Sequence, residues 1–283
     1  MRAIVLGSGA GGGYPQWNCG CGNCRAVREG RPGFLARTQD SVALVGDGGV
    51  VLVNCSPDVL VQIARTRALW PQTARGTPIA GIVLTNGDLD HVLGLFSLRE
   101  SQPLHVYATA SVWRGLEQSV FLRTLRRFEG QLTVHELALD EPVAIEGLAI
   151  TPFALAGKRP VHLPGEPEAD DNIGLRVAGK QTLVYAAACA RVRPFECDVL
   201  LFDGTFYRED ELVRAGLGSA RAADMAHVPI EVSIDQSIAW RAPRRIYTHI
   251  NNSNPILDPE SDERRSVIRA GWEIAFDGME IEL

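Results

Sequence analysis

Short apolar runs separated by turn residues make up most of the hydrophobic pattern of this chain. Glycine-containing turns such as Asp47-Gly48-Gly49 and Asp277-Gly278 lie between paired runs, which is a strong hairpin signal. The pattern predicts hairpins of Ser41–Val45 with Val50–Val53, Ile173–Val177 with Thr182–Tyr185, and Glu273–Phe276 with Met279–Leu283. It predicts further strands at Arg2–Leu6, Ala80–Leu84, Leu104–Tyr107, Val199–Phe202 and Arg245–Thr248.

Helices are expected between these strands. Ser56 and Pro57 open a helix that runs to about Arg65, with Ser56 as its cap and Pro57 in its first turn. The apolar residues of His91–Arg99 have helical spacing. Thr109 follows a predicted strand and is expected to cap the next helix.

Each half of the chain has a hairpin and then a strand with polar residues at its carboxyl end. These residues are Asp88, Asp90, His91, Asp203 and His249. Ligand sites in sheets flanked by helices favour the carboxyl ends of strands. We therefore expect one domain, residues 1–283, in which two sheets pack face to face with helices outside. The proline-rich stretch Arg159–Asp171 is the longest predicted loop and is expected to overhang the site.

Composition and charge exclude several classes of function. The 283 residues are 46% apolar and 22% charged, which is ordinary for a globular protein. A net charge of -6, without clustered Lys and Arg, argues against nucleic-acid binding. No apolar run is long enough to span a membrane, and Gly7–Gly13 ends the apolar start too early for a secretion signal. We expect a cytoplasmic protein.

Six cysteines are unevenly distributed. Cys19, Cys21 and Cys24 form a tight Cys-x-Cys-x-x-Cys cluster. In a reducing compartment such a cluster indicates a metal site, here structural zinc with a fourth ligand from elsewhere in the chain. The alternative is a redox-reactive thiol patch. The other cysteines are expected to be buried structural thiols and are Cys55, Cys189 and Cys197.

The loop after the predicted strand Ala80–Leu84 has the spacing of the metallo-β-lactamase metal loop, His-x-His-x-Asp-His. The first two histidine positions hold Asn86 and Asp88, whereas Asp90 and His91 are retained. Oxygen ligands with one imidazole move such a site from zinc towards iron or manganese. The alternative is a polar loop with a chance Asp-His pair, because short motifs give false positives.

Two further histidines and one carboxylate complete the candidate chemistry. Asp203 and His249 each end a predicted strand, and with Asp90 and His91 they supply the two histidines and one carboxylate of non-haem iron oxygenases. His227 is a candidate general acid or base because histidine titrates near neutrality. Taken singly, both His227 and His249 also fit ordinary loop or packed histidines.

A glycine-rich run near the start resembles a dinucleotide fingerprint but lacks its context. Gly7-Ser8-Gly9-Ala10-Gly11-Gly12 matches G-x-G-x-x-G after a strand, yet the loop continues towards the cysteines and no helix is expected there. We expect these glycines to allow tight turns beside the metal loop.

These motifs together resemble the family of pyrroloquinoline quinone (PQQ) biosynthesis protein B, in the metallo-β-lactamase superfamily. The resemblance runs from the first residue to the last. The matching segments are Gly11 to Cys19 (GGGYPQWNC) with Cys21 and Cys24, Leu84 to Asn86, Asp90-His91, Gly94-Leu95, Leu98 to Glu100, Leu200 to Phe206 (LLFDGTF), His249 to Asn252, Asn254 to Leu257, Gly271-Trp272 and Asp277 to Ile281.

The resemblance implies an α/β fold, a four-layer αββα sandwich with its active site at one edge between the sheets. It implies an iron-dependent hydroxylase that uses O2 on the tyrosine-derived ring of a PQQ precursor made from a Glu-Tyr crosslinked peptide. The implied Fe(II) ligands are Asp90, His91 and His249, with Asp203 at the bridging-carboxylate position. Asn86 and Asp88 line the site by the same match. Our own hypothesis is that His227 or Asp88 transfers protons during the reaction.

The chain departs from related sequences at two places. Ala226 to Ser233 replaces a run that relatives begin with Gly-His and continue with a turn rich in Ser and Gly. Hydrolytic relatives close the cysteine site with a histidine where this chain has Asn252, so Asn252 is a candidate but poor fourth zinc ligand and that ligand is unassigned.

Two other functions stay open. One is a carrier, without catalysis, that moves PQQ or a precursor towards the periplasm. The other is a zinc hydrolase, although losing two histidines removes most of one zinc site. A homodimer is left open as an assembly.

Overall fold

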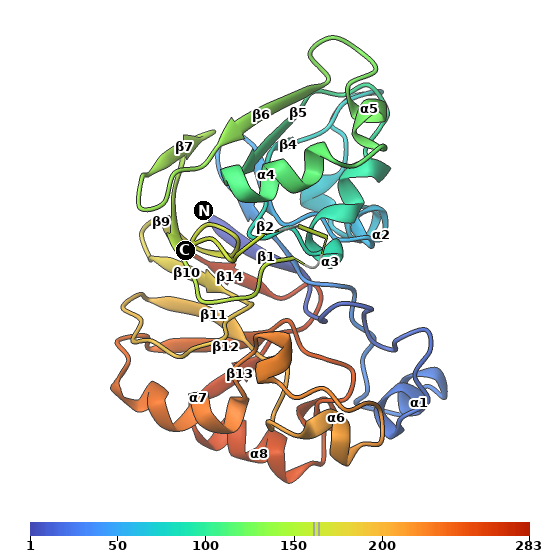
Figure 1. Cartoon of the computed structure of the whole chain (residues 1–283), viewed down its shortest axis with the longest axis vertical. Helices are drawn as coiled ribbons and strands as arrows, with labels where there is room; N and C mark the ends of the chain where they lie inside the picture. The colour runs from blue at the N-terminus through green and yellow to red at the C-terminus, as the bar shows by residue number, and fades with distance from the viewer. Residues whose placement is uncertain (161, 164) are drawn as a thin grey trace.

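The computed structural model describes residues 1–160, 162–163 and 165–283 and contains two seven-stranded sheets packed face to face (Figure 1). The first sheet has the order β14 (Glu280–Glu282), β1 (Arg2–Gly7), β2 (Ser41–Val45), β3 (Val50–Val53), β4 (Ile79–Val83), β5 (Leu104–Ala108) and β6 (Leu132–Glu136). The second has the order β13 (Trp272–Ile274), β12 (Arg244–Thr248), β11 (Val199–Asp203), β10 (Leu183–Ala186), β9 (Ile173–Ala178), β8 (Leu148–Ala154) and β7 (Val143–Ile145).

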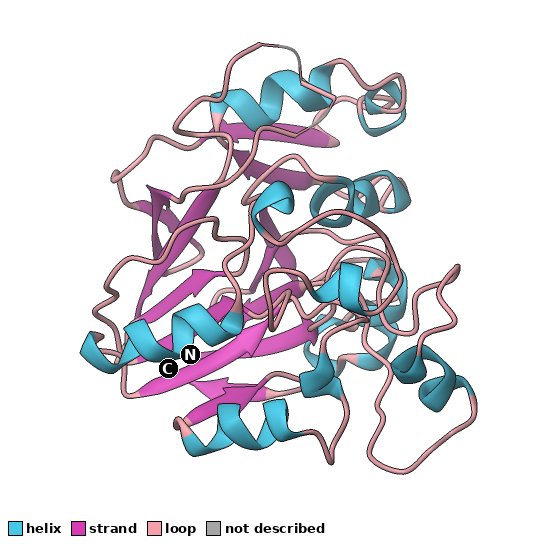
Figure 2. Ribbon diagram, turned by 60° about the horizontal axis from the view of Figure 1, so that its bottom comes forward, coloured by secondary structure: helices cyan, strands magenta, loops and turns pink. Residues whose placement is uncertain are grey.

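Helices cover the outer faces of both sheets (Figures 1 and 2). The first sheet is covered by α2 (Val59–Arg65), α3 (Leu89–Val92), α4 (Ala110–Glu117) and α5 (Leu122–Leu125). The second sheet is covered by α7 (Ile230–Gln236) and α8 (Asp262–Arg269), with the short α6 (Glu211–Arg214) near them. Helix α1 (Gly22–Arg28) lies to one side, apart from the strands of this sheet (Figure 1). Short 3-10 turns occupy Arg67–Leu69, Leu93–Ser97, Ala223–Met225, Ser237–Ala239 and Pro255–Leu257.

The apolar runs of the sequence are continuous because most strands are buried on both faces. In β1, Ala3 and Val5 pack into the core between the sheets, whereas Ile4 and Leu6 pack against the helices of the first sheet. This alternation follows from the two-residue period of a strand. The structure confirms the predicted four-layer αββα sandwich.

Two of the three predicted hairpins are confirmed. In the first, β2 and β3 pair antiparallel with Val42 opposite Val53. In the second, β9 and β10 pair antiparallel with Val177 opposite Leu183.

The third predicted hairpin, Glu273–Phe276 with Met279–Leu283, is wrong. β13 pairs parallel with β12 in the second sheet, whereas β14 pairs antiparallel with β1 in the first. The chain crosses between the sheets through residues 275–279. This crossing brings the two termini together, where the backbone N–H of Leu283 donates to the carbonyl of Met1 (3.0 Å; Figures 1 and 2).

The helix predictions need two corrections. The first helix begins at Val59, and Ser56 does not cap it: the Ser56 hydroxyl accepts from the backbone N–H of Asp58 and contacts Gln62. The stretch His91–Arg99 is not one helix, because α3 ends at Val92 and a 3-10 turn follows. The predicted cap Thr109 is confirmed, since its side chain accepts from the backbone N–H of Val112.

Parallel pairing positions the candidate site. β4 pairs parallel with β3 and β5, and β11 pairs parallel with β10 and β12. Carboxyl ends of parallel strands lie at the same sheet edge, so the loops after β4, β11 and β12 converge.

Within the described chain, none of the helices has the length and apolar content that a membrane span needs.

Candidate metal centre

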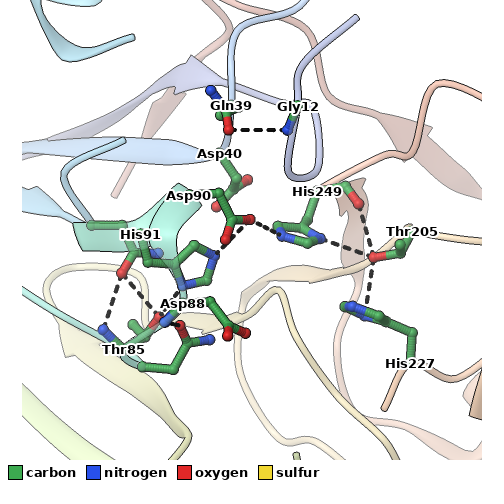
Figure 3. A network of polar contacts seen from close by, with 12 residues as sticks. Gly12, Gln39, Asp40, Thr85, Asp88, Asp90, His91, Thr205, His227 and His249 are labelled. Carbon is green, nitrogen blue, oxygen red and sulfur yellow. Dashed lines mark hydrogen bonds and ion pairs between the residues drawn. The ribbon is translucent and has the colours of Figure 1, made fainter. Parts of the chain in front are cut away.

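Asp90, His91 and His249 converge at one edge of the two sheets. The Asp90 Oδ2 atom lies 3.3 Å from the Nε2 of His249 and 3.8 Å from the Nε2 of His91 (Figure 3). Potential ligand atoms of all three lie within 4.8 Å of one another. The short helix α3, which follows β4, supplies Asp90 and His91, and the residue after β12 is His249.

Hydrogen bonds orient the His91 imidazole so that its Nε2 faces Asp90. Its Nδ1 lies 3.3 Å from the Thr85 hydroxyl, and that hydroxyl donates to the side-chain oxygen of Asn54 (3.0 Å). The Thr85 hydroxyl therefore accepts the Nδ1–H, which leaves a lone pair on Nε2. That Nε2 is buried and has no hydrogen-bond partner among the described residues. The lone pair of such a nitrogen can coordinate a metal ion.

Thr205 performs the same task for His249. Its hydroxyl donates to Oδ1 of Asp203 (2.7 Å). The same hydroxyl lies 2.9 Å from the Nδ1 of His249 (Figure 3). A hydroxyl has one donor, so it accepts from the Nδ1–H of His249, and this directs the His249 Nε2 towards Asp90. Such second contacts fix the tautomer and ring orientation of metal-binding histidines.

The backbone at His249 is held in the left-handed region. Its φ is +54°, which is uncommon for a residue other than glycine. The following residues are fixed by backbone bonds from Ile250 N to Ser8 O (2.9 Å) and from Asn251 N to Thr205 O (3.1 Å). Backbone strain that the surroundings maintain in this way is concentrated at functional sites.

The charges of these groups depend on one another. Burial alone would lower the pKa of His249, but the hydrogen bond and negative charge of Asp90 raise it to about 9. Burial alone would raise the pKa of Asp90, yet its interactions with His91 and His249 hold it well below the ordinary range. Burial lowers the pKa of His91, so this imidazole is neutral and able to bind a metal. The cluster thus holds an ionised carboxylate ready to bind a cation.

Asp203 and His227 form a second group that shares His249. The Nδ1 of His227 lies 2.7 Å from Oδ2 of Asp203, and the imidazoles of His227 and His249 stack with ring centres 5.4 Å apart. Asp203 accepts four hydrogen bonds, also from the backbone of Cys189 and from the backbone and hydroxyl of Thr205. Interaction with His227 outweighs burial and lowers the pKa of Asp203. Asp203 therefore anchors this side of the site as a carboxylate.

The loop after β4 keeps its shape through Asn86. The Asn86 side chain accepts from the backbone N–H of Asp88 (3.0 Å) and donates to the side chain of Asn172 (3.2 Å). A Cβ on Gly11 would lie 3.3 Å from Oδ2 of Asp90, so the glycine-rich run passes close to the metal loop as expected. No helix follows this run before Gly22, so the structure agrees with rejecting a dinucleotide fingerprint.

A cavity of about 300 Å³ opens beside these residues. Its lining includes Asp90, His91 and His249 together with Asn86, Asp88 and His227, which are the candidates of the sequence analysis. The predicted long loop is confirmed: residues 155–172 join β8 to β9 and place Lys158 in the cavity wall. Residues 161 and 164 of that loop lie outside the described residues. The volume is at the lower end of the range for small-molecule sites.

The three clustered cysteines also converge. The Sγ atoms of Cys19, Cys21 and Cys24 lie within 4.8 Å of one another, and none forms a disulfide. The side-chain Nδ2 of Asn252 is 3.1 Å from Sγ of Cys19 and 3.4 Å from Sγ of Cys24. Hydrogen bonds from its neighbours outweigh burial and lower the pKa of Cys21, which favours the thiolate that binds metals. The remaining cysteines are buried, as predicted: Cys55, Cys189 and Cys197.

Sequence reasoning missed several residues that hold the site together. Thr205 follows Asp203 in a motif that the resemblance already contained, so its hydroxyl was a detectable signal. Asn54 gives a weaker signal, because asparagine directly after a strand is one of the few residue types that tolerate a left-handed backbone, and its φ is +63°. Lys158 and Asn172 carry no local signal of a site.

Comparisons with known proteins agree with this architecture. Residues 50–250 match the model of the β-lactamase superfamily domain. The chain is 43% identical to coenzyme PQQ synthesis protein B of Methylobacterium sp. strain 4-46, with complete coverage of both chains. It is 39% identical to the protein of the same name from Ruegeria pomeroyi, again with complete coverage of both.

Solved structures of related proteins have the same fold. The structure is similar to the Zn²⁺-bound PqqB from Methylobacterium extorquens, with a TM-score of 0.94, 36% identity and complete coverage of both chains. A diphosphatase of the PhnP family has a TM-score of 0.72 at 22% identity, with 100% of this chain and 97% of that one covered. The second likeness shows a shared fold.

Proposed function

The chain belongs to the coenzyme PQQ synthesis protein B family of the β-lactamase superfamily, and on this premise we propose an iron-dependent oxygenase that hydroxylates a PQQ precursor. Membership of the family gives it a role in PQQ biosynthesis. The proposed substrate is the tyrosine-derived ring of a precursor made from a Glu-Tyr crosslinked peptide, and the co-substrate is O2.

One observation carries this proposal. One carboxylate and two imidazoles, Asp90, His91 and His249, meet at the cavity, and the buried His91 Nε2 has no hydrogen-bond partner in the part of the chain that the structure describes. This set is the one that non-haem iron oxygenases use, with positions left open for oxygen and substrate. Asn86 and Asp88 stand where two histidines complete a two-zinc site, so a two-metal hydrolase would lack two of its imidazole ligands here. Asp203, His227 and His249 form a second group whose ligand atoms lie close enough to hold a metal ion.

The chain's own residues have distinct roles in the proposal. Fe(II) bound by Asp90, His91 and His249 would supply the activation of O2. Thr85 and Thr205 hold the two imidazoles with Nε2 towards the cavity. Structural zinc is assigned to the cysteine cluster.

The remaining polar residues position groups or move protons. Asp88 and His227 line the cavity and are the candidate proton-transfer groups. Asp203 stays a prediction as a metal ligand: its oxygens already accept four hydrogen bonds, so ligation would replace one of them.

The test compares the metal, the oxygen use and the product of one preparation. Wild type is purified without oxygen and loaded with Fe(II) or Zn²⁺, and metal content is measured by elemental mass spectrometry. We expect O2 consumption and a product with added oxygen only with Fe(II). The variants Asp90→Ala and His249→Ala should lose the iron and at least about 100-fold in rate, since even contacts behind metal ligands contribute 10–100-fold. His105→Ala, a histidine in β5 outside the cavity lining, is the matched control.

Each alternative function predicts a different result. Product formation with zinc and without oxygen would replace the oxygenase by a hydrolase. Tight binding of PQQ without turnover under any metal would favour the carrier. Full oxygen consumption by either ligand variant would show that the ligand assignment is wrong.

A further inference from the structure

The cavity beside the metal centre has one basic side chain that the proposed metal chemistry does not use. Among the described residues that line it, Lys158 is the sole lysine and no arginine is present. Asp88 and Asp90 also line the cavity, and they are carboxylates that repel an anionic ligand. An anionic ligand would therefore place its negative group at Lys158.

The backbone around Lys158 is fixed on both sides. A Cβ on Gly157 would lie 2.5 Å from the side-chain nitrogen of Asn172, so only glycine allows this close approach. Asn172 is held in turn by the carbonyls of Leu155 (3.1 Å) and Ala188 (2.9 Å). The wall on which Lys158 stands is thus preformed.

Residues on the other side of Lys158 are held by ion pairs. The guanidinium of Arg159 contacts both Asp171 (2.8 Å) and Glu168 (3.2 Å). Arg159 therefore connects the start of the loop to residues near its end, Glu168 and Asp171. Lys158 is exposed between these two anchored neighbours and forms no ion pair with any residue that the structure describes.

The residue type supports a ligand contact. Lysine occurs twice in the sequence, as Lys158 and Lys180, and the other side chains that are positively charged at neutral pH without a pKa shift are arginines. An ammonium on a flexible stem is a compact charge with rotatable donors, whereas arginine is suited to planar, two-point contacts. Asn86 donates to Asn172, and both donors of the Asn172 amide are bonded to backbone carbonyls, so Lys158 is the positively charged donor on this wall.

We propose that Lys158 binds a carboxylate of the substrate and so holds the ring to be oxidised towards Asp90, His91 and His249. This inference rests on the proposed function, because it takes the substrate to be a PQQ precursor. A compound made from glutamate and tyrosine carries carboxylates, which is the chemistry that a lone ammonium recognises. Lys158 is thus assigned as a substrate-binding residue.

Binding of PQQ to the metal-loaded protein tests this assignment without turnover. PQQ is the probe because its rings also carry carboxylates, and its Kd is measured by calorimetry. Lys158→Ala should weaken binding by about 10- to 100-fold, the range for one hydrogen bond to a charged group. Lys158→Arg should restore most of the affinity. Lys180→Ala, which removes the other lysine in the turn after β9, should bind as wild type does.

A neutral ligand separates the specific contact from a general loss of charge. The fully esterified methyl ester of PQQ should bind wild type and Lys158→Ala equally. Equal PQQ affinity of Lys158→Ala and wild type would overturn the inference. Equal losses for Lys158→Ala and Lys180→Ala would overturn it as well, because they would indicate a long-range effect of net charge.

Kinetics keep this inference distinct from the proposed function. If the protein is an oxygenase, Lys158→Ala should raise KM more than it lowers kcat, since the contact is present before the reaction. If oxygenase activity is absent while PQQ binding depends on Lys158, the proposed function fails and the binding site stands. If the oxygenase is active and Lys158→Ala leaves both affinity and KM unchanged, the binding site fails and the proposed function stands.

Discussion

The edge metal centre and the cysteine cluster each bring together three side chains able to bind a metal, but their surroundings differ. Asp90, His91 and His249 border a cavity of about 300 Å³. Cys19 and Cys24 are buried against the amide of Asn252, whereas Cys21 also lines a surface hollow of about 680 Å³ that holds none of the edge residues. Structural zinc sites are closed by protein ligands, whereas catalytic sites keep a position open. From the ligand types, three thiolates against one carboxylate and two imidazoles, we propose a structural metal at the cysteines and the chemistry at the edge.

One loop nevertheless serves both regions. His249 enters the edge centre, and Asn252, three residues later, reaches the cysteines. Between them, Ile250 and Asn251 are bonded to the backbones of Ser8 and Thr205. A metal in the cysteine cluster would therefore stabilise the loop that carries an edge ligand.

Removing one cysteine is expected to have the largest effect on stability of the changes considered. Cys24→Ala should lose the cluster's metal and lower the Tm by about 10 °C, which corresponds to about 3–5 kcal/mol in a chain of this size. His249→Ala should lose the edge metal and activity with a much smaller change of Tm. Differential scanning calorimetry and metal analysis of both variants measure the separation. Equal loss of stability in the two variants would contradict the division into structure and chemistry.

A change at Thr205 tests the hydrogen bonds behind the edge centre. Thr205→Val keeps the shape but removes the hydroxyl that contacts Asp203, His227 and His249. We expect metal affinity or product formation to fall by about 10- to 100-fold, as for other partners of metal-binding histidines. The measurements are competition for metal with a chelator and kcat/KM.

Thr151→Val, in β8 and outside the cavity lining, is the matched control for Thr205→Val. An unchanged metal affinity and kcat/KM in Thr205→Val would show that the imidazoles are oriented by other contacts.

The smallest effect on activity is expected at Asn252. Its Nδ2 faces the sulfurs, and a half-turn of the amide would put Oδ1 in that position as an oxygen ligand. Asn252→His should slow zinc loss to a chelator by at least about 10-fold, because imidazole is the better zinc ligand. Product formation should stay at the wild-type level. Faster zinc loss in this variant would show that the amide itself completes the site.

Local spacing in the sequence predicted much of the candidate site. Asp90 and His91 are adjacent, and the cysteines fall within six positions, so short segments bring these groups together in any fold that keeps the loops. Two correct hairpins followed from turn residues in the same way. The predicted third hairpin failed because Asp277-Gly278 indicates a turn and says nothing about which sheet the next strand joins.

The sequence by itself determined the types of donor and the strands that carry them, because these depend on residues close together in the chain. Only the tertiary structure brought Asp90 within 3.3 Å of His249, a residue 159 positions away, and set Thr205 behind it. It also placed Lys158 in the cavity wall, where no local pattern marks it. Such contacts depend on how two sheets pack and on where the long loop is anchored, and these are properties of the whole chain.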